Sequence, residues 1–386
     1  MNTWDVIVIG AGAVGSAALR AASEAGARAL CLEHHAPAHE RGSSHGHSRI
    51  FRHAYFEHPD YVPLLRHSTA RFESLERESG VALLHRCGML VTGPHDSTVV
   101  HGSLASGRRW DLAVQALDTN ALESRFPWFA HPGDSIGAFE ANAGLVRPEA
   151  AVHAALGVAG SRGAELRIGT RVHALVEDAS GVWVDTQHGR ERAGSVIVAA
   201  GAWSSQLLPE LTRQLTVTRQ VQAWVATTPG KDVSGLPCWY VDRGPRERHL
   251  YGLPPDPTAP TQQGAAASRA RHPKVGLHGS DVVVNPDAGA AEVDDTDLAT
   301  VWRAYRAVAP ALAGPVAAAA TCLYTMSPDG QFIVGTRPGA RRIHMAAGLS
   351  GHGFKLSPAL GDALVDLAIH GRTELPIGFL SPTRFP

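Results

Sequence analysis

A glycine-rich turn between an apolar run and a helical segment constrains the fold of this 386-residue chain most strongly. The apolar run DVIVIG, residues 5–10, is typical of a strand buried on both faces, and it leads into GAGAVG at residues 10–15. Residues 13–25 have helical composition, and a second apolar run, ALCLE, ends at Glu33. This order predicts a βαβ unit of the dinucleotide-binding type, in which a strand, a glycine turn, a helix and a second strand ending in an acid follow one another.

The glycine turn predicts a binding site for the pyrophosphate of a dinucleotide. Gly10, Gly12 and Gly15 let the backbone approach the phosphates, and the following helix N-terminus presents free amide hydrogens and a favourable dipole. Glu33 would accept hydrogen bonds from the ribose hydroxyls, and its charge would disfavour a phosphate on that ribose. The unit therefore favours FAD or NAD over NADP.

A second glycine-rich turn near the other end of the chain separates these two cofactors. GLSGHGFK, residues 348–355, precedes a predicted helix over residues 356–370. Backbone amides and a helix dipole at that turn can face an acceptor that becomes negative during reaction, and a reduced flavin is such an acceptor. This arrangement favours FAD.

The composition restricts the partners of the chain. With 35 basic and 36 acidic residues and no long charge run, nothing indicates nucleic acid or an anionic membrane surface, so we expect a small-molecule substrate. The apolar start is interrupted by glycines and has no basic region before it, which argues against a signal peptide or membrane span and favours a cytoplasmic protein. The cysteines show no paired spacing and the 21 histidines show no ligand motif, so we expect neither a disulfide framework nor a metal site.

The rest of the chain predicts a mixed fold, α/β and α+β, in which a Rossmann-like FAD-binding domain is interleaved with a substrate domain on a mostly antiparallel sheet. Helices are expected at residues 61–79, 148–162, 296–309 and 356–370. Strands are expected near residues 87–92, 139–146, 195–203, 216–228, 240, 250, 275–278 and 341–348, with a ladder formed by residues 165–178 and 181–189.

We assign residues 1–80, 145–215 and 320–386 to the FAD-binding domain, and residues 81–144 and 216–319 to the substrate domain. Residues 254–273, rich in proline, alanine and small polar residues without an apolar period, are expected to form a flexible surface insertion.

Several motifs together resemble one known family. GAGAVG with Glu33, GSSHGHSRIFRHAY, EHPDYVPL, VAAGAWSS, TCLYT and AAGLSGHGFKLSP are similar to the monomeric sarcosine oxidase and N-methyltryptophan oxidase family of FAD amine oxidases, in the family's order and over nearly the whole chain. The resemblance implies a monomer that oxidises the C–N bond of a secondary amino acid, N-methyl or cyclic, to an imine. Oxygen would be the electron acceptor and hydrogen peroxide the second product.

The resemblance also implies which residues hold the cofactor. Cys322, in TCLYT, is similar to the cysteine whose sulfur is bonded to the methyl carbon on the flavin's benzene ring. The full set of expected cofactor-binding residues is Gly10, Gly12, Ala13, Val14, Gly15, Glu33, Ser43, Ser44, Arg49, Val172, Gly201, Trp203, Cys322, Gly351, Gly353, Phe354 and Lys355.

The substrate carboxylate needs compensating cations in a water-poor pocket, and Arg52 and Lys355 match the family positions that bind it. Arg49 and His45 match positions beside the flavin ring, where the resemblance implies that they tune charge and polarity.

Four further residues are expected in catalysis or substrate binding. Tyr251, Tyr324 and His278 match residues that line the substrate face, and Lys274 matches the lysine that activates oxygen on the opposite face of the flavin. A cation there would stabilise the negative charge that develops on oxygen. The chain departs from the family pattern here, because 22 residues separate Tyr251 from Lys274 (274 − 251 − 1), more than the family is expected to have.

Alternatives remain at this stage. The same fold could act as an oxidase or dehydrogenase on a cyclic imino acid or an amino acid of specialised metabolism. An NAD-dependent dehydrogenase would leave GLSGHGFK and Cys322 unexplained, and a flavin-binding subunit without turnover is the remaining possibility from another class.

Overall fold

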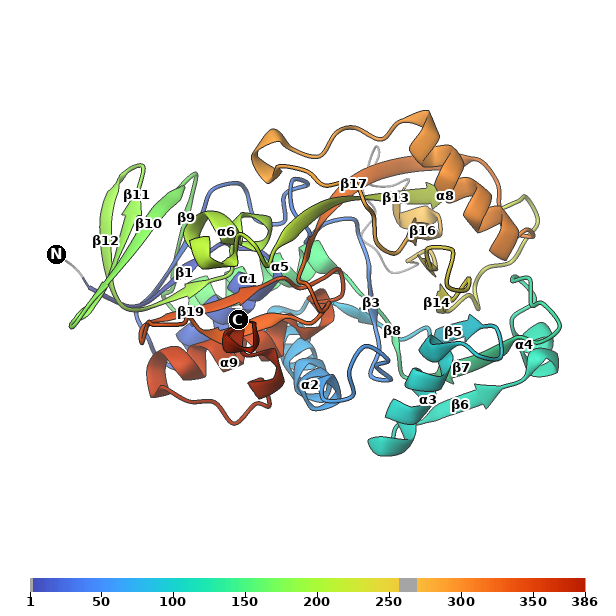
Figure 1. Ribbon diagram of the computed structural model, residues 1–386, viewed down its shortest axis with the longest axis horizontal. Coiled ribbons are helices and arrows are strands. Elements are labelled where there is room, and N and C mark those ends of the chain that lie inside the picture. The colour runs from blue at the N-terminus through green and yellow to red at the C-terminus, as the bar shows by residue number, and fades with distance from the viewer. Residues whose placement is uncertain (1–2, 257–268, 386) are drawn as a thin grey trace.

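Two large sheets side by side form the framework of the molecule, which is described here from a computed structural model covering residues 3–256 and 269–385 (Figure 1). The first sheet contains the predicted βαβ unit. Its central strands are parallel neighbours: β12 (Gly189–Val198), β1 (Trp4–Ile9), β2 (Ala29–Glu33) and β9 (Glu165–Ile168). β19 (Ile343–Ala347) pairs in parallel with the end of β12, while β10 (Val172–Asp178), β11 (Gly181–Thr186) and β18 (Ile333–Thr336) join by antiparallel pairing.

Helices cover this sheet and build its core. The packed set consists of α1 (Ala13–Glu24), α2 (Tyr61–Ser79), α5 (Pro148–Ser161) and α9 (Ser357–His370). α1 and α9 approach each other so closely that a Cβ added to Gly361 would lie 2.7 Å from the backbone nitrogen of Ala18. The glycine is therefore required by the contact between these two helices.

The second sheet follows the order β17 (Val316–Met326), β13 (Thr216–Val225), β16 (Lys274–Leu277), β15 (Leu250–Leu253), β14 (Cys238–Val241), β5 (Met89–Gly93), β7 (Ile136–Glu140) and β6 (Val114–Leu117). All its pairings are antiparallel except that between β14 and β5. α8 (Asp295–Val308), α3 (Thr98–Arg109) and α4 (Thr119–Arg125) pack on it.

Shorter elements complete the described chain. A small sheet of β3 (Arg49–Phe51), β8 (Gly144–Val146) and β4 (Leu84–His85) lies between the two large ones. The remaining short helices are η1 (Gly201–Trp203), α6 (Ser204–Leu207), η2 (Pro209–Leu211), η3 (Pro286–Ala288), η4 (Phe354–Leu356), η5 (Gly378–Leu380) and η6 (Pro382–Arg384). Within residues 3–256 and 269–385, the helices are all too short or too polar to cross a membrane.

The predicted fold class is confirmed, and several elements differ in detail. The strand expected over residues 139–146 is two strands, β7 and β8, in different sheets. The strand expected over residues 195–203 ends at Val198, and a 3-10 turn follows. The expected ladder is wrong at its start, because β9 pairs with β2 and only β10 and β11 pair with each other. Strand β17 had no sequence prediction.

The proposed division into domains stays a prediction, and β17 crosses its boundary at residue 320. Most of the predicted insertion over residues 254–273 lies outside the described residues, which resume at 269. The two ends of this gap are joined, because the backbone nitrogen of Asp256 donates to the carbonyl of Ala270 at 3.1 Å. Asp256 is also held by a buried bidentate ion pair with Arg147, at 2.5 and 2.8 Å.

Candidate functional site

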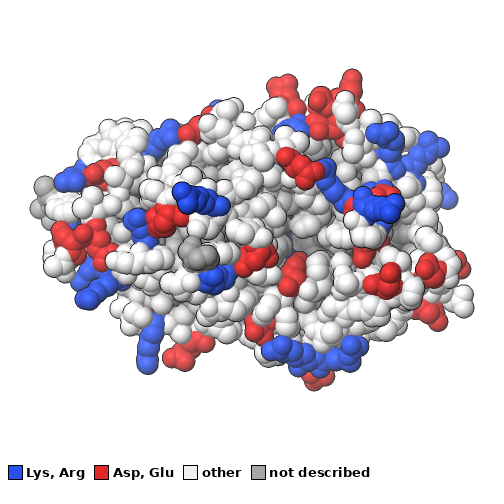
Figure 2. Space-filling view, in the orientation of Figure 1, with Lys and Arg blue, Asp and Glu red and all other residues white. Residues whose placement is uncertain are grey.

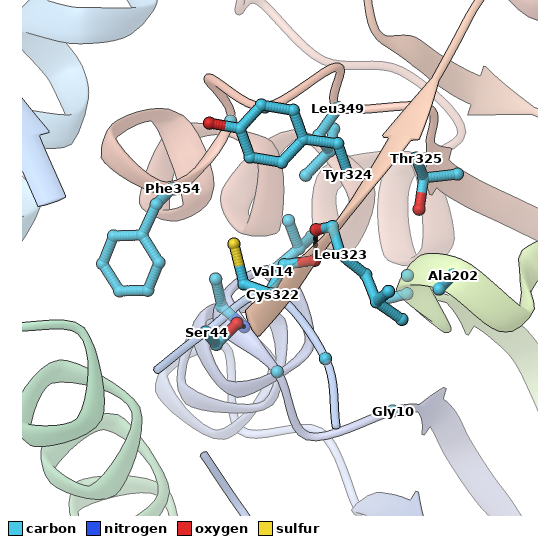
Figure 3. Close-up of a pocket in the computed structure, with 18 of the residues that line it drawn as sticks. Gly10, Val14, Ser44, Ala202, Cys322, Leu323, Tyr324, Thr325, Leu349 and Phe354 are labelled. Atoms are coloured by element: carbon cyan, nitrogen blue, oxygen red, sulfur yellow. Dashed lines mark hydrogen bonds between the residues drawn. The ribbon is translucent and has the colours of Figure 1, made fainter. Parts of the chain in front are cut away.

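The candidate site is a long cavity between the two large sheets. It is lined by the turn after β1, the loop before β3, the facing residues of β13, β15, β16 and β17, and the glycine-rich turn after β19. Figure 3 shows its middle part, where Val14 and Ser44 are drawn beside Cys322 of β17, with Tyr324 above the sulfur and Phe354 to its left. Segments far apart in the sequence thus contribute to one site.

The turn after β1 has the close packing that a pyrophosphate site requires. Gly10 has a φ of 95°, and a Cβ there would lie 2.6 Å from the carbonyl oxygen of Ala199. A Cβ on Gly15 would lie 1.7 Å from the carbonyl oxygen of Gly10. Gly12, at the N-cap of α1, supplies no side chain to that helix end, so backbone can face a ligand there.

Glu33 stands at the end of β2, buried in the cavity wall. Its carboxylate accepts the amide of Ala11 at 2.7 Å and that of His35 at 2.7 Å. Burial raises its pKa, and these backbone bonds oppose the rise. Each carboxylate oxygen has a second lone pair, so Glu33 can fix the glycine turn and still accept a ribose hydroxyl.

Cys322 is a buried free thiol on β17 that lines the cavity. Burial raises its pKa, while Arg49, a hydrogen bond from Gln222 and Lys274 act in the opposite direction. Apart from that thiol contact, the amide nitrogen and oxygen of Gln222 have no hydrogen-bond partner among the described residues, although the side chain is buried and lines the cavity. The wall beside Cys322 therefore has unused hydrogen-bonding capacity.

Two basic side chains lie in the cavity wall near this thiol. The Lys274 ammonium is 2% exposed and donates to the carbonyls of Gly46, at 3.0 Å, and Ser48. Burial, and then Arg49, holds its pKa well below the usual range. Arg49 is fixed by bonds from its guanidinium to the carbonyls of Ser48, at 2.9 Å, and Ser43, at 2.8 Å.

His45 lies behind this wall rather than in it. It is 1% exposed, and burial followed by Arg49 lowers its pKa to about 3, so the ring is neutral. Neither ring nitrogen has a partner among the described residues.

At another part of the cavity, Arg52 and Lys355 form a buried cationic pair. Arg52 donates through Nη2 to both carboxylate oxygens of Glu57, at 2.6 and 2.7 Å, and its guanidinium lies 4.3 Å from the ring centres of Tyr55 and Phe56. Burial would raise the pKa of Glu57, but Arg52 lowers it to about 2. Burial and Arg52 together lower the pKa of Lys355 to about 7.

Aromatic residues complete this part of the cavity. Tyr324 lies 5.7 Å from His278 between ring centres, and Tyr240 lies 5.8 Å from the same histidine. Burial raises the pKa of Tyr251 and Tyr324, so both keep their hydroxyl protons. Burial also lowers the pKa of His278 to about 4, which makes its ring neutral at physiological pH.

The structure gathers nearly all residues expected at the site. The expected residues that line the cavity are Gly10, Gly12, Ala13, Val14, Glu33, Ser43, Ser44, Arg49, Arg52, Val172, Gly201, Trp203, Tyr251, Lys274, His278, Cys322, Tyr324, Gly351, Gly353, Phe354 and Lys355. Gly15 and His45 lie behind the wall.

Sequence reasoning missed several lining residues. Tyr240 and Gln222 belong to no quoted motif and are placed only by strand pairing in the second sheet. Glu57 and His352 stand inside the quoted motifs EHPDYVPL and GLSGHGFK, so a closer reading of those motifs could have found them.

Outside the cavity, basic and acidic side chains are interspersed over the face shown in Figure 2. This distribution agrees with the balanced charge of the sequence.

Comparisons with known proteins match this chain over nearly its whole length. The family model described as DAO, FAD dependent oxidoreductase, matches residues 5–367. Monomeric sarcosine oxidase of Streptomyces avermitilis is 37% identical, with 99% of this chain and 98% of that protein covered. N-methyl-L-tryptophan oxidase of Salmonella newport is 33% identical, with the same coverage.

Among solved structures, the open form of NikD, titled an unusual amino acid oxidase essential for nikkomycin biosynthesis, has a TM-score of 0.84 at 27% identity and covers 99% of this chain and 98% of its own. Glycine oxidase from Geobacillus kaustophilus shares the fold, with a TM-score of 0.77 at 20% identity and full coverage of both chains.

Proposed function

Because the chain belongs to the FAD dependent oxidoreductase family and is an FAD-dependent amine oxidase acting on amino acids, we propose that its substrate is a secondary amino acid, N-methyl or cyclic. The C–N bond would be oxidised to an imine, and oxygen would be reduced to hydrogen peroxide. The observation that carries the proposal is the pair Arg52 and Lys355, buried in the wall of the same cavity as the glycine turn.

The residues present fit an FAD. At Gly10 and Gly15 any side chain would collide with backbone, so the turn leaves its outer surface to a ligand's phosphates. Apart from the thiol contact, the buried Gln222 amide in the cavity wall has no hydrogen-bond partner among the described residues, and a ring with hydrogen-bonding edges would supply one. When bound, the FAD supplies a two-electron acceptor for the C–N bond and returns the electrons to oxygen.

Arg52 and Lys355 would bind the substrate carboxylate and orient the C–N bond. A carboxylate leaving water needs charged partners, and a charge-assisted hydrogen bond contributes about 1.5 to 3 kcal/mol. The same cations would lower the pKa of the substrate ammonium, because like charges disfavour its protonated form. The amine would thereby reach the neutral state in which its lone pair is available, without a dedicated base.

The aromatic side chains would close the site around the substrate. Tyr251, Tyr324 and His278 are neutral and partly buried, so they can exclude water and hydrogen-bond the amine without adding charge. Lys274 would act on the oxygen-reducing half of the reaction, where its charge would stabilise the negative charge that develops on oxygen. Arg49 and His45 would adjust the polarity around the cofactor.

We also propose that Cys322 holds the FAD covalently. The support is a free, buried thiol that lines the cavity, where Arg49 and Lys274 partly oppose the rise in its pKa that burial causes. The remaining cofactor contacts are proposed at the residues expected from the sequence, with Gly15 acting through the packing of the turn. We further propose a monomer that works in the cytoplasm, with no membrane or nucleic acid partner.

The likeness to NikD favours a second candidate, a cyclic imino acid or another amino acid of specialised metabolism. A panel of sarcosine, longer N-methyl amino acids, L-proline and L-pipecolate, assayed for oxygen uptake and peroxide, separates the two. Turnover of the N-methyl compounds supports the first candidate, and turnover confined to the cyclic compounds supports the second. If no secondary amino acid were oxidised while primary ones were, the proposed substrate class would be wrong.

A further inference from the structure

His352 occupies a place in the cavity wall that the proposed mechanism does not use. It follows Gly351 in the glycine-rich turn, and its ring has two close polar contacts. Nδ1 lies 2.6 Å from the hydroxyl oxygen of Tyr55, and Nε2 lies 3.1 Å from the carbonyl oxygen of Gly330. Together the two contacts fix which ring nitrogen of His352 carries the proton and where the Tyr55 hydroxyl directs its hydrogen.

The direction follows from what each partner can donate. Burial lowers the pKa of His352 to about 3, Glu57 opposes this effect and Lys355 adds to it, so the ring is neutral and carries one proton. The Gly330 carbonyl only accepts, so that proton is on Nε2 and Nδ1 is an acceptor. The Tyr55 hydroxyl therefore donates to Nδ1, in preference to its longer contact of 3.3 Å with the His352 carbonyl.

This arrangement leaves the lone pairs of the Tyr55 oxygen for Lys355. The Lys355 ammonium lies 3.4 Å from that oxygen and 2.8 Å from the His352 carbonyl oxygen. An ammonium has three donors, so two are directed to protein and the third is available to a ligand in the cavity. His352 thus acts on Lys355 twice, through its own carbonyl and through Tyr55.

We propose that His352 is a positioning residue, which turns the Tyr55 hydroxyl so that its oxygen accepts from Lys355 and thereby holds Lys355 charged and aimed at a substrate carboxylate. The inference rests on the proposed function in one respect, that the ligand of Lys355 is a carboxylate. Without an acceptor at residue 352, the Tyr55 hydroxyl can turn its hydrogen toward the ammonium. The contact would then favour the neutral amine.

The other groups facing Lys355 do not remove this effect. Arg52 disfavours the ammonium, Glu57 favours it but is paired with Arg52, and His278, directly after β16, is neutral. The pKa of Lys355 in the wild type therefore lies near neutral pH, so the loss of one hydrogen-bond acceptor changes the protonation of Lys355 measurably.

The test is binding of 2-furoate, a carboxylate without an amine, measured from the change in flavin absorbance of the holoenzyme between about pH 6 and pH 9. His352→Leu removes the acceptor and keeps an apolar side chain of similar reach. We expect a roughly tenfold weaker affinity, with the loss of binding displaced to lower pH, and a rise in KM that exceeds the change in kcat. His352→Asn restores an acceptor at the position of Nδ1 and should recover most of the affinity.

Three further variants distinguish the positioning of Lys355 from a general disturbance of the fold. Tyr55→Phe should weaken binding like His352→Leu, and the double variant should be no weaker than Tyr55→Phe alone, because both changes remove one chain of contacts. His344→Leu is the matched control, since His344 is a buried histidine on β19 with a hydroxyl contact, to Thr336 at 3.1 Å, and lies outside the cavity lining. It should bind 2-furoate normally.

The role of His352 would be overturned if His352→Leu bound 2-furoate with the affinity and pH dependence of the wild type. Additive losses of affinity in the double variant would also overturn it. So would a His352→Asn variant that binds 2-furoate as weakly as His352→Leu. A wild-type protein that binds no 2-furoate would instead contradict the carboxylate site itself, and with it both the proposed function and this inference.

Discussion

If Arg52 binds the substrate carboxylate as proposed, Glu57 competes with the substrate for Arg52, and removing the charge of Glu57 should tighten carboxylate binding. Both oxygens of Glu57 accept from the Nη2 of Arg52, at 2.6 and 2.7 Å, in a wall of the cavity. In Glu57→Gln the amide oxygen can still accept, but the bond is neutral. A charged hydrogen bond contributes about 1.5 to 3 kcal/mol and a neutral one about 0.5 to 1.5, so Arg52 would be released by about 1 to 2 kcal/mol.

That difference corresponds to a roughly 5- to 30-fold lower dissociation constant for a carboxylate. The measurement is an equilibrium titration of the holoenzyme with 2-furoate, followed by flavin absorbance, at low and at high ionic strength. Glu73→Gln is a suitable control, because Glu73 forms an exposed ion pair with Arg86 and lies outside the cavity lining. If Glu57→Gln bound 2-furoate as weakly as the wild type, or more weakly, Glu57 would be a support of Arg52 and the competition argument would fail.

Four other predictions concern the cofactor, oxygen, ligand protonation and packing. Acid-precipitated wild-type protein should stay yellow and Cys322→Ser should release its flavin; colour in the wild-type supernatant would refute the covalent bond. Lys274→Met should slow reoxidation of the reduced enzyme by oxygen roughly 100-fold or more while anaerobic reduction changes little, and equal effects in stopped-flow traces would remove its assigned role. Affinity for 2-furoate should fall as pH rises through about 7, because Lys355 loses its proton there, although a bound carboxylate moves the limit upward; a flat profile would show that Lys355 does not carry the binding charge. Gly361→Ala should cost about 1 to 3 kcal/mol in thermal or urea unfolding, because its methyl group would lie 2.7 Å from the Ala18 nitrogen, and an unchanged stability would mean that α1 and α9 can separate freely.

Local patterns predicted the nucleotide-binding part of the fold well, because each element there carries its own signal. DVIVIG is apolar without alternation, the glycines follow at once, and Glu33 ends the next apolar run. The helix expected at residues 61–79 is observed with the same bounds, ended by Gly80 in a left-handed conformation with a φ of 70°.

The second sheet was harder to predict, because its strands are defined by partners far along the chain. The start of β17, VAAAAT, has neither alternation nor β-branched enrichment, and it is extended because it pairs with β13 about a hundred residues earlier. Strand β9 follows a helix and pairs with β2, whereas the sequence predicted that residues 165–178 as a whole form a ladder with residues 181–189. Strand pairing between distant segments depends on tertiary structure, so local sequence patterns do not predict it.

The residues of the site also divide into those that local motifs indicate and those that only tertiary structure places. Motifs predicted that Arg52 and Lys355 line the cavity, but the pairing of Arg52 with Glu57 depends on side-chain directions that a sequence does not contain. Tyr240 reaches the cavity because β14 pairs with β15, which carries Tyr251 directly opposite. His45 stands in a motif and yet is buried outside the cavity lining.

The central claim is that this cavity oxidises the C–N bond of secondary amino acids, and anaerobic reduction by matched pairs of compounds tests it most directly. The holoenzyme would be mixed without oxygen with glycine and sarcosine, and with alanine and N-methylalanine, while the visible flavin absorbance is recorded. The account predicts that the N-methylated member of each pair bleaches the flavin and that the primary amine does so far more slowly. Equal bleaching by both members of a pair, or faster bleaching by the primary amines, would contradict it.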